Sequence, residues 1–185
     1  LLGQGDAVGA FVFDADLRKA LPARNRPDHL DALLSVLSLP ASSDRNAART
    51  RLAATLTAVG ERVGRRGLVV LASDLLDADA DALAPLSQLS ALGHEVVVLH
   101  VLHPHELDFP FKHGIRFEDA EGPESLEADA DVVREAYRAE LDAFLEASRQ
   151  RCIASGARYA LARTDRPVEE TVASVLLAGK RRGWG

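Results

Sequence analysis

The stretch that decides the fold runs from Arg65 to Asp77 and reads Arg-Arg-Gly-Leu-Val-Val-Leu-Ala-Ser-Asp-Leu-Leu-Asp. Its centre, Leu68 to Leu71, is an unbroken apolar run, too short for a helix and without polar alternation. This pattern predicts a strand buried on both faces, as in a parallel sheet covered by helices. Ser73 and Asp74 follow at the carboxyl end of the strand, where open α/β sheets bind their ligands.

Two interpretations of Asp74 stay open at this point. A carboxylate beside the Ser73 hydroxyl suits a hard cation or a polar partner. In the other interpretation Asp74 is structural and closes or caps the loop that follows the strand. Its position in the sequence does not decide between them.

Composition places the chain among globular proteins. The 185 residues are 47% hydrophobic and 27% charged, which fits one domain with a sizeable core. The net charge of -6 argues against a nucleic-acid-binding surface. Cys152 is the single cysteine, so an internal disulfide is excluded and a reducing compartment is expected. No apolar run is long enough to span a bilayer, and we therefore expect a cytoplasmic protein.

The flanking sequence predicts an α/β order of elements. Asp6 to Phe13 indicates a strand, and Leu17 to Leu21 an antiparallel edge strand that Pro22 stops. Glu95 to Leu102 indicates a second buried strand, joined to the first by a helix that Gly93 ends, as a right-handed parallel crossover. Further helices are expected from Pro27 to Pro40, from Asp44 through Val63, from Asp129 to Ser155 and after Pro167, with short strands at Ile115–Phe117 and Tyr159–Leu161.

The first residues of the chain resemble a stretch from the interior of a longer sequence. The sequence contains no methionine and opens with Leu1-Leu2-Gly3-Gln4-Gly5-Asp6, which resembles the end of a helix and its exit turn. We therefore expect residues 1–185 to be the carboxyl part of a longer protein.

Several side chains invite a catalytic or metal-binding interpretation and have a simpler one. His100, His103 and His105, with Glu106 as a fourth ligand, suggest zinc, but the spacing is not a tight ligand signature and strand-end histidines are favoured. For Glu106, a loop carboxylate bonded to backbone amides is favoured. Cys152 lies on the apolar stripe of a helix and is expected to be a packed thiol. The sequence holds no Walker A or dinucleotide-binding glycine motif.

The order of motifs along the chain resembles an uncharacterised bacterial family, domain-of-unknown-function family fifty-eight. The motifs are Ser73-Asp74-Leu75-Leu76-Asp77, Gly93-His94-Glu95-Val96, Pro104-His105-Glu106, Phe117-Glu118-Asp119-Ala120-Glu121-Gly122, Arg134-Glu135-Ala136-Tyr137 and Thr164-Asp165-Arg166-Pro167. The resemblance covers essentially the whole chain. It implies a three-layer, von Willebrand factor A-like (Rossmann-like) α/β fold, with a mostly parallel sheet, an antiparallel edge strand and helices on both faces. Members of the family are commonly encoded beside MoxR-type AAA+ ATPases.

The resemblance also implies a metal-ion-dependent adhesion site, in which Mg²⁺ bridges the domain to a carboxylate of a partner. Asp74 matches the aspartate loop of such a site, with Ser73 and Ser43 as its neighbours. The Asp-x-Ser-x-Ser loop has no match, because the first strand and helix of the family pattern lie before Leu1. We therefore expect Mg²⁺ in the full-length protein and none in this chain. If the missing strand is central, Val8–Phe13 and Leu68–Ala72 flank its place in the sheet.

These implications define the expected function. The chain is expected to be a non-enzymatic protein-binding module, whose partner is a MoxR-type ATPase or a client of that ATPase. The alternative is a Mg²⁺-dependent hydrolase that uses the strand-end acids Asp74, Asp77 and Glu106.

Overall fold

The structure is a computed structural model that describes residues 2–14, 16–40, 51–64, 66–76, 81–118 and 125–180. The chain divides into two compact units. The first is built mainly from Leu1–Gly64, and the second from Arg65–Leu76, Leu83–Asp119 and Pro123–Gly185. Each unit is described by itself. Within the described residues, no helix combines the length and the apolar character needed to cross a membrane.

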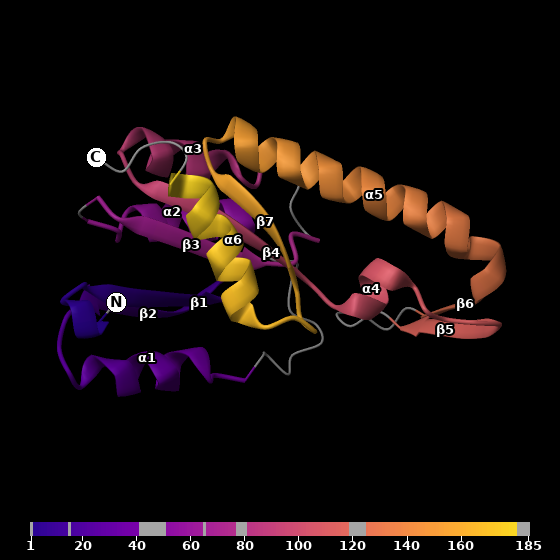
Figure 1. Cartoon of the computed structure of the whole chain (residues 1–185), viewed down its shortest axis with the longest axis horizontal. Helices are drawn as coiled ribbons and strands as arrows, with labels where there is room; N and C mark the ends of the chain where they lie inside the picture. Colours follow the sequence, from indigo (N-terminus) through magenta and orange to yellow (C-terminus); the bar gives the residue numbers. More distant parts are fainter. Residues whose placement is uncertain are drawn as a thin grey trace. The chain divides into compact units, whose positions relative to one another are not determined.

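The first unit contains an antiparallel hairpin and two helices (Figure 1). After the short helix η1 (Leu2–Gln4), strand β1 (Val8–Phe13) pairs with β2 (Leu17–Arg24). Helix α1 (His29–Leu37) packs on the hairpin through a small apolar core. That core consists of Ala10, Leu33 and Val36, with Leu2, Val8, Val12 and Leu21 around it. Strand β2 continues past Pro22, against expectation, because the edge strand of a hairpin tolerates a residue without an N–H.

Helix α2 (Leu52–Gly60) buries the apolar side that the sequence predicts. Leu52, Leu56 and Val59 are each less than a tenth exposed. Val63, expected on the same stripe, lies after the helix has ended. The expected start of this helix at Asp44 lies outside the described residues.

The second unit is organised around a parallel sheet with the strand order β3-β4-β7 (Figure 1). Strand β3 (Leu68–Ser73) runs parallel to β4 (Glu95–Leu102), which runs parallel to β7 (Arg158–Arg163). Helix α3 (Ala84–Ala91) connects the first two strands. The predicted parallel pairing of the two apolar runs is confirmed.

The burial of these strands differs from the expectation in one respect. Strand β4 is the buried one, since Val96, Val97 and Val98 are at most 2% exposed. In β3 only Leu71 is buried, while Leu68 and Val70 are about half exposed. Strand β3 lies at the margin of the sheet, and a strand with one neighbour shields its side chains less than a central strand does. The prediction that it is buried on both faces was therefore wrong.

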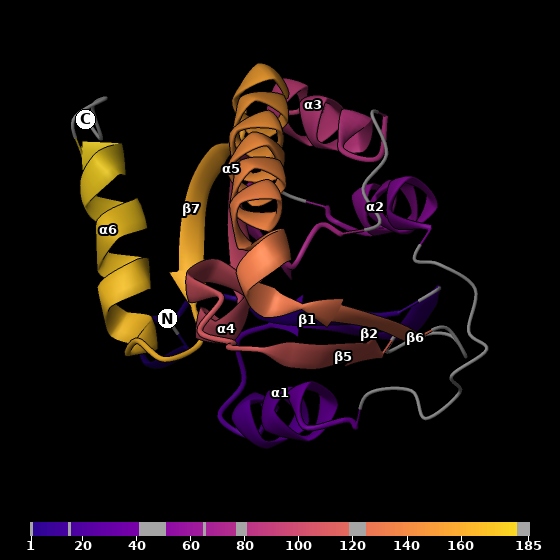
Figure 2. The same ribbon diagram turned by 90° about the vertical axis from the view of Figure 1, so that its right-hand side faces the viewer.

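Two antiparallel hairpins form two-stranded sheets that are separate from the parallel sheet. One is β1–β2, expected as the margin of the main sheet. The other joins β5 (Gly114–Glu118) to β6 (Ser125–Asp129) and precedes the long helix α5 (Ala130–Ala154). The sequence predicted β5 and α5 but neither β6 nor the short helix α4 (Pro104–Asp108). The last helix, α6 (Val168–Lys180), contacts β7, as α5 does (Figure 2).

Glycine ends two of these helices, as predicted. Gly93 has a φ of +88°, and the adjacent amides close a Schellman turn, Gly93 N to Ser90 O at 3.0 Å and His94 N to Leu89 O at 3.1 Å. Gly156 ends α5 with a φ of +80°. The left-handed backbone explains why glycine occupies both positions.

Candidate functional site

The candidate site lies where the three parallel strands end. In the sheet register, Ser73 of β3 pairs with His100 of β4, and Leu102 of β4 pairs with Arg163 of β7. The residues that follow these strands therefore meet at one edge of the sheet, named here the carboxyl edge. This is the edge at which open α/β sheets bind ligands.

The loop after β3 is closed by its own side chains. Ser73 Oγ accepts a hydrogen bond from the Leu75 amide, and Asp74 Oδ1 accepts one from the Leu76 amide, both at 3.2 Å. Leu75 adopts a left-handed φ of 57° and is 1% exposed, so it anchors the loop in the core. The hydrogen bond from the Leu76 amide is the contact that the loop-closing interpretation of Asp74 predicts. Asp74 is exposed, and an ionised carboxylate has about four acceptor positions, so one amide does not use up its capacity.

The structure describes two of the three predicted metal ligands. Ser73 and Asp74, which are consecutive in the sequence, lie at the carboxyl edge. Ser43, the third predicted ligand, lies outside the described residues, as does Asp77 of the alternative hydrolase set.

Glu106 caps the short helix α4. Its Oε2 accepts a hydrogen bond from the His103 amide at 2.6 Å, and His103 Nδ1 accepts one from the His105 amide at 3.1 Å. Together they form a reciprocal capping box. The favoured interpretation of Glu106 as a loop carboxylate bonded to backbone is confirmed.

The three histidines of the zinc hypothesis do not converge. His100 is fully buried on β4, whereas His105 is exposed on α4 and His103 is exposed directly before that helix. The rings of His103 and His105 pack edge to face, with their centroids 4.7 Å apart. Among the residues that the structure describes, no group of three or more His, Cys, Asp and Glu side chains is placed to hold a metal ion.

The segment after β4 is held by helix α5. Arg134 donates to two backbone carbonyls, Phe109 O and Phe111 O, both at 2.6 Å. Tyr137, one turn further along the helix, donates to Glu106 O at 2.9 Å. Phe109, at the centre of this segment, has a left-handed φ of 43° and is 1% exposed. The motif Arg134-Glu135-Ala136-Tyr137, used above only as a family signature, therefore anchors one side of the carboxyl edge.

Arg163 connects the end of β7 to the same segment. Its guanidinium makes a bidentate pair with Asp108, at 3.0 and 2.8 Å, and also contacts Asp165 at 3.0 and 3.1 Å. These hydrogen bonds hold the pKa of Asp108 and the pKa of Asp165 below their usual range. Sequence reasoning missed the pair of Arg163 and Asp108, because these two residues are 55 positions apart in the chain.

His100 occupies the core beneath the carboxyl edge. Its Nδ1 lies 2.9 Å from the Tyr159 hydroxyl, and its ring packs edge to face on Phe144 of α5 at 5.3 Å. Burial lowers the pKa of His100, whereas the backbone of Asp74 and the carboxylates of Asp74 and Glu106 act to raise it. The favoured interpretation of His100 as a strand histidine, and not a zinc ligand, agrees with this packing in the core.

Cys152 is the packed thiol that the sequence predicts. Its side chain is fully buried on α5. Burial raises the pKa of the thiol to about 11, which keeps it protonated at neutral pH.

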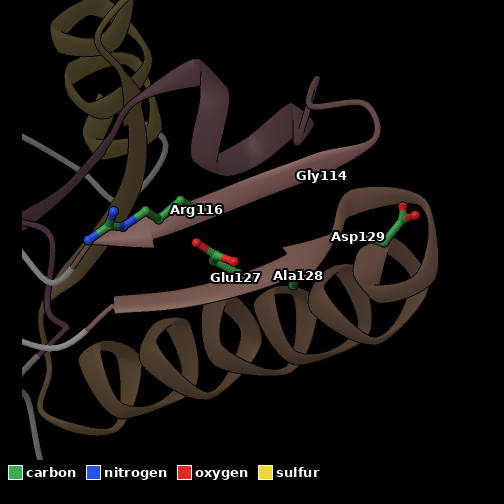
Figure 3. A pocket seen from close by; sticks show the side chains of 5 residues that line it. All are labelled: Gly114, Arg116, Glu127, Ala128 and Asp129. Atoms are coloured by element: carbon green, nitrogen blue, oxygen red, sulfur yellow. The ribbon is translucent and has the colours of Figure 1, made fainter.

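A shallow hollow lies on the β5–β6 hairpin, away from the predicted residues. It has a volume of about 510 Å³ and is lined by Gly114, Arg116, Glu127, Ala128 and Asp129. Figure 3 shows Arg116 and Glu127 on facing strands, where they form a cross-strand pair of opposite charge. Binding sites gather side chains from several elements around an enclosed, mostly apolar space, and this open hollow of one hairpin does not.

Two solved structures share the fold. The conserved hypothetical protein BatB from Bacteroides thetaiotaomicron matches with a TM-score of 0.56 and 15% identity, over 95% of this chain and 79% of that chain. An aerotolerance-related membrane protein from Bacteroides fragilis NCTC 9343, with multiple mutations to serines, matches with a TM-score of 0.55 and 17% identity, over 92% of this chain and 77% of that one. At such identities the likeness shows the fold alone, and it confirms the resemblance to von Willebrand factor A-like proteins.

Sequence relatives and a family model complete the comparison. Uncharacterized protein Rv1480 of Mycobacterium tuberculosis (strain ATCC 25618 / H37Rv) is 28% identical over 119 residues, which are 64% of this chain. Uncharacterized protein Mb1516 of Mycobacterium bovis (strain ATCC BAA-935 / AF2122/97) matches to the same extent. The match spans 37% of the length of these relatives. The family model described as "Protein of unknown function DUF58" matches residues 1–149, and the chain therefore belongs to the DUF58 family.

Proposed function

We propose that this chain is a non-enzymatic protein-binding module that works with a MoxR-type AAA+ ATPase or a client of that ATPase. The contact is made at the carboxyl edge, where Asp74 faces a Mg²⁺ ion that a carboxylate of the partner also binds. Cytoplasmic placement is part of the proposal, since the partner hydrolyses ATP and the thiol of Cys152 is kept reduced.

The position of Asp74 is the observation that carries the proposal. It combines a fold of the von Willebrand factor A type with an exposed carboxylate directly after a parallel strand. Leu75 is buried next to it, so the carboxylate is presented from a fixed backbone and loses little entropy when it binds. A preorganised carboxylate of this kind is what a hard cation needs.

Asp74 and Ser73 do not make a complete Mg²⁺ site. Mg²⁺ demands near-octahedral oxygen geometry and gives up its water reluctantly. In the proposal, the remaining oxygen ligands come from the loop around Ser43 and from a hydroxyl-bearing loop of the longer protein. Ser73 contributes only if its hydroxyl, which accepts from the Leu75 amide, also turns toward the ion.

A binding measurement with a matched control tests the proposal. The full-length protein is titrated with the MoxR-type ATPase of the same organism, in Mg²⁺ and in EDTA. Asp74→Ala should weaken Mg²⁺-dependent binding at least roughly tenfold, because it leaves the partner carboxylate without its bridge. Asp142→Ala, which removes an exposed carboxylate from α5, should leave binding unchanged.

Titration of residues 1–185 with Mg²⁺ or Mn²⁺ alone forms the second arm of this experiment. Binding should be weak, because Asp74 is the one well-matched ligand. Partner binding that survives both EDTA and Asp74→Ala would contradict the proposal. Stoichiometric micromolar Mg²⁺ binding by residues 1–185, abolished by Asp74→Ala, would show that these residues already contain the complete site.

A further inference from the structure

The amino end of helix α4 is capped by an imidazole. His103 occupies the N-cap position with an extended backbone, φ -76° and ψ 145°, and Pro104 follows at the first helical position. The backbone is usual for an N-cap, but the side chains that usually act there are those of Ser, Thr, Asp and Asn. None of these changes its charge between about pH 5 and pH 8, whereas imidazole does. The proposed function does not account for a titratable cap.

The cap depends on one nitrogen of the His103 ring. In the first turn, Pro104 has no N–H, and the amides of Glu106 and Leu107 both donate to the His103 carbonyl, at 3.0 and 3.3 Å. The amide of His105 donates to His103 Nδ1 at 3.1 Å. A backbone N–H can only donate, so Nδ1 carries a lone pair and the ring proton is on Nε2. The cap therefore requires the neutral ring.

Two charged or titratable side chains next to the ring belong to α4 itself. Glu106 Oε2 accepts a hydrogen bond from the His103 amide at 2.6 Å, and its carboxylate favours a protonated ring. The ring of His105 packs edge to face on that of His103, with the centroids 4.7 Å apart. Two imidazolium ions at this separation would repel each other. Protonation of both rings therefore opposes the packed arrangement, while Glu106 limits the effect.

The neighbouring elements bring groups that keep their charge state. These groups are Tyr137, Arg134 and Arg138 of α5, His100 of β4 and Arg163 of β7. Burial raises the pKa of Tyr137, so its phenol stays protonated, and burial lowers the pKa of His100, which favours its neutral ring. The arginines donate to backbone carbonyls or to Asp108. We therefore assign the change in charge at α4 between about pH 5 and pH 8 to His103 and His105.

We propose that His103 makes the amino end of α4 sensitive to protons. The neutral ring accepts the His105 amide, whereas a proton on Nδ1 removes the acceptor, so the capping box keeps only the hydrogen bond to Glu106. The first turn is ordered near pH 7.5 and loosened near pH 5, while the hydrogen bond from Tyr137 still holds the helix to α5. Because α4 follows β4, this element lies at the carboxyl edge. The inference does not depend on the function proposed above.

The tautomer is measured in the wild-type protein by long-range ¹H–¹⁵N correlation spectra of the histidine rings, near pH 7.5. The expected result for His103 is a protonated Nε2 and an unprotonated Nδ1. A proton on Nδ1 would overturn the proposal, because that nitrogen could not accept the His105 amide. The measurement needs no substitution, so it does not depend on the folding of a variant.

The loss of the cap is measured at the His105 amide by hydrogen exchange, with each rate divided by the intrinsic rate at the same pH. In the wild type, protection should fall roughly fivefold between about pH 7.5 and pH 5, the size expected for one lost capping hydrogen bond. His103→Asn supplies a capping oxygen that does not titrate and should keep the protection at both pH values. His103→Ala has no cap and should show low protection at both.

Two controls separate the cap from other effects of pH. His105→Gln removes the second imidazole but keeps the amide, and most of the pH dependence should remain because the acceptor belongs to His103. The amide of Val98, in the middle of β4, should show unchanged protection. Both substituted side chains are exposed, so the variants are expected to fold. A wild-type pH dependence in His103→Asn, or an equal fall in protection at Val98, would overturn the proposal.

Discussion

The segments that follow β3 and β4 have similar conformations but are held in place by different contacts. Each leaves a parallel strand at the carboxyl edge and buries one large apolar residue in a left-handed conformation, Leu75 after β3 and Phe109 after β4. A left-handed backbone costs such residues about 1–2 kcal/mol, and the burial of the side chain offsets it. The difference lies in what holds the backbone around them.

The β3 loop is held locally, and the β4 segment is held from a distance. Ser73 and Asp74 close their own loop with two short-range hydrogen bonds. Around Phe109, the carbonyls are taken by Arg134 of α5, 25 and 23 residues further along the chain. The β3 loop leaves the carboxylate of Asp74 exposed at the carboxyl edge. In the β4 segment, the carboxylate of Glu106 and the guanidinium of Arg134 are hydrogen-bonded to the backbone. This contrast is why Asp74, rather than Glu106, is the candidate for binding.

Truncation of Phe109 should give the largest effect. Phe109→Ala removes a 1% exposed ring that packs on Phe111 at 5.2 Å and on Tyr137 at 4.5 Å. The expected loss of unfolding free energy is about 3–5 kcal/mol, from urea melts. Phe111→Ala, at the less buried neighbour, is the control and should cost clearly less. Equal losses would show that the segment is anchored by the pair of rings and not by Phe109.

Removal of the Arg134 guanidinium should have the next largest effect. Arg134→Met keeps the apolar stem over Phe109 but leaves two backbone carbonyls without their charged donor. A loss of about 2–3 kcal/mol is expected in urea melts, with no comparable effect from Arg149→Met, whose salt bridge is exposed. A loss of unfolding free energy below about 0.5 kcal/mol would show that the hydrogen bonds from Arg134 do not hold the β4 segment.

Asp74→Ala should change stability little. It removes one hydrogen bond at 3.2 Å from an exposed loop, so the expected loss in denaturant melts is below about 1 kcal/mol. Asp74→Asn, which keeps an acceptor oxygen, should be closer still to the wild type. A loss of several kcal/mol for Asp74→Ala would show that its role is purely structural.

The Asp108–Arg163 pair should make the smallest contribution to stability. We expect it to be visible only in the pH dependence of the Tm. Because the folded-state pKa of Asp108 is depressed, its contribution is present above the unfolded pKa and is lost as the pH falls through the folded value. Between pH 5 and pH 3 the wild-type Tm should therefore fall more than that of Asp108→Asn. High salt should narrow the difference, because the pair is exposed. An identical pH dependence in both proteins would contradict the pairing.

The sequence could predict what depends on local pattern. The apolar runs of β3 and β4, the stop of α3 at Gly93 and that of α5 at Gly156 follow from side-chain period and backbone sterics. Periodicity could not show which apolar run is central, so the half exposure of Leu68 and Val70 was missed. The burial of a strand depends on the strands that pair with it, and the sequence of one strand does not specify its partners.

Only the part of the candidate site that consists of neighbouring residues in the sequence was predictable. Ser73 and Asp74 could be placed at a strand end from the residues around them. The role of Arg134 could not, because an arginine on an amphipathic helix is expected to face solvent, and its acceptors are carbonyls that any residue carries. The favoured interpretation of His100 as an ordinary strand histidine agrees with its burial on β4, but spacing could not show that Phe144 and Tyr159 pack against its ring.

The register of the parallel sheet also has a kinetic consequence. In the hairpin, Phe11 pairs with Ala20, so little chain must be closed before the contact forms. In the sheet, Val97 pairs with Arg158, and all of α4, the β5–β6 hairpin and α5 lie between them. Contacts so distant in sequence form only after a large loop has been closed, and the entropy lost in closing it slows folding. We therefore expect docking of β7 on β4 to limit the folding rate of the second unit, and α5 to form before it.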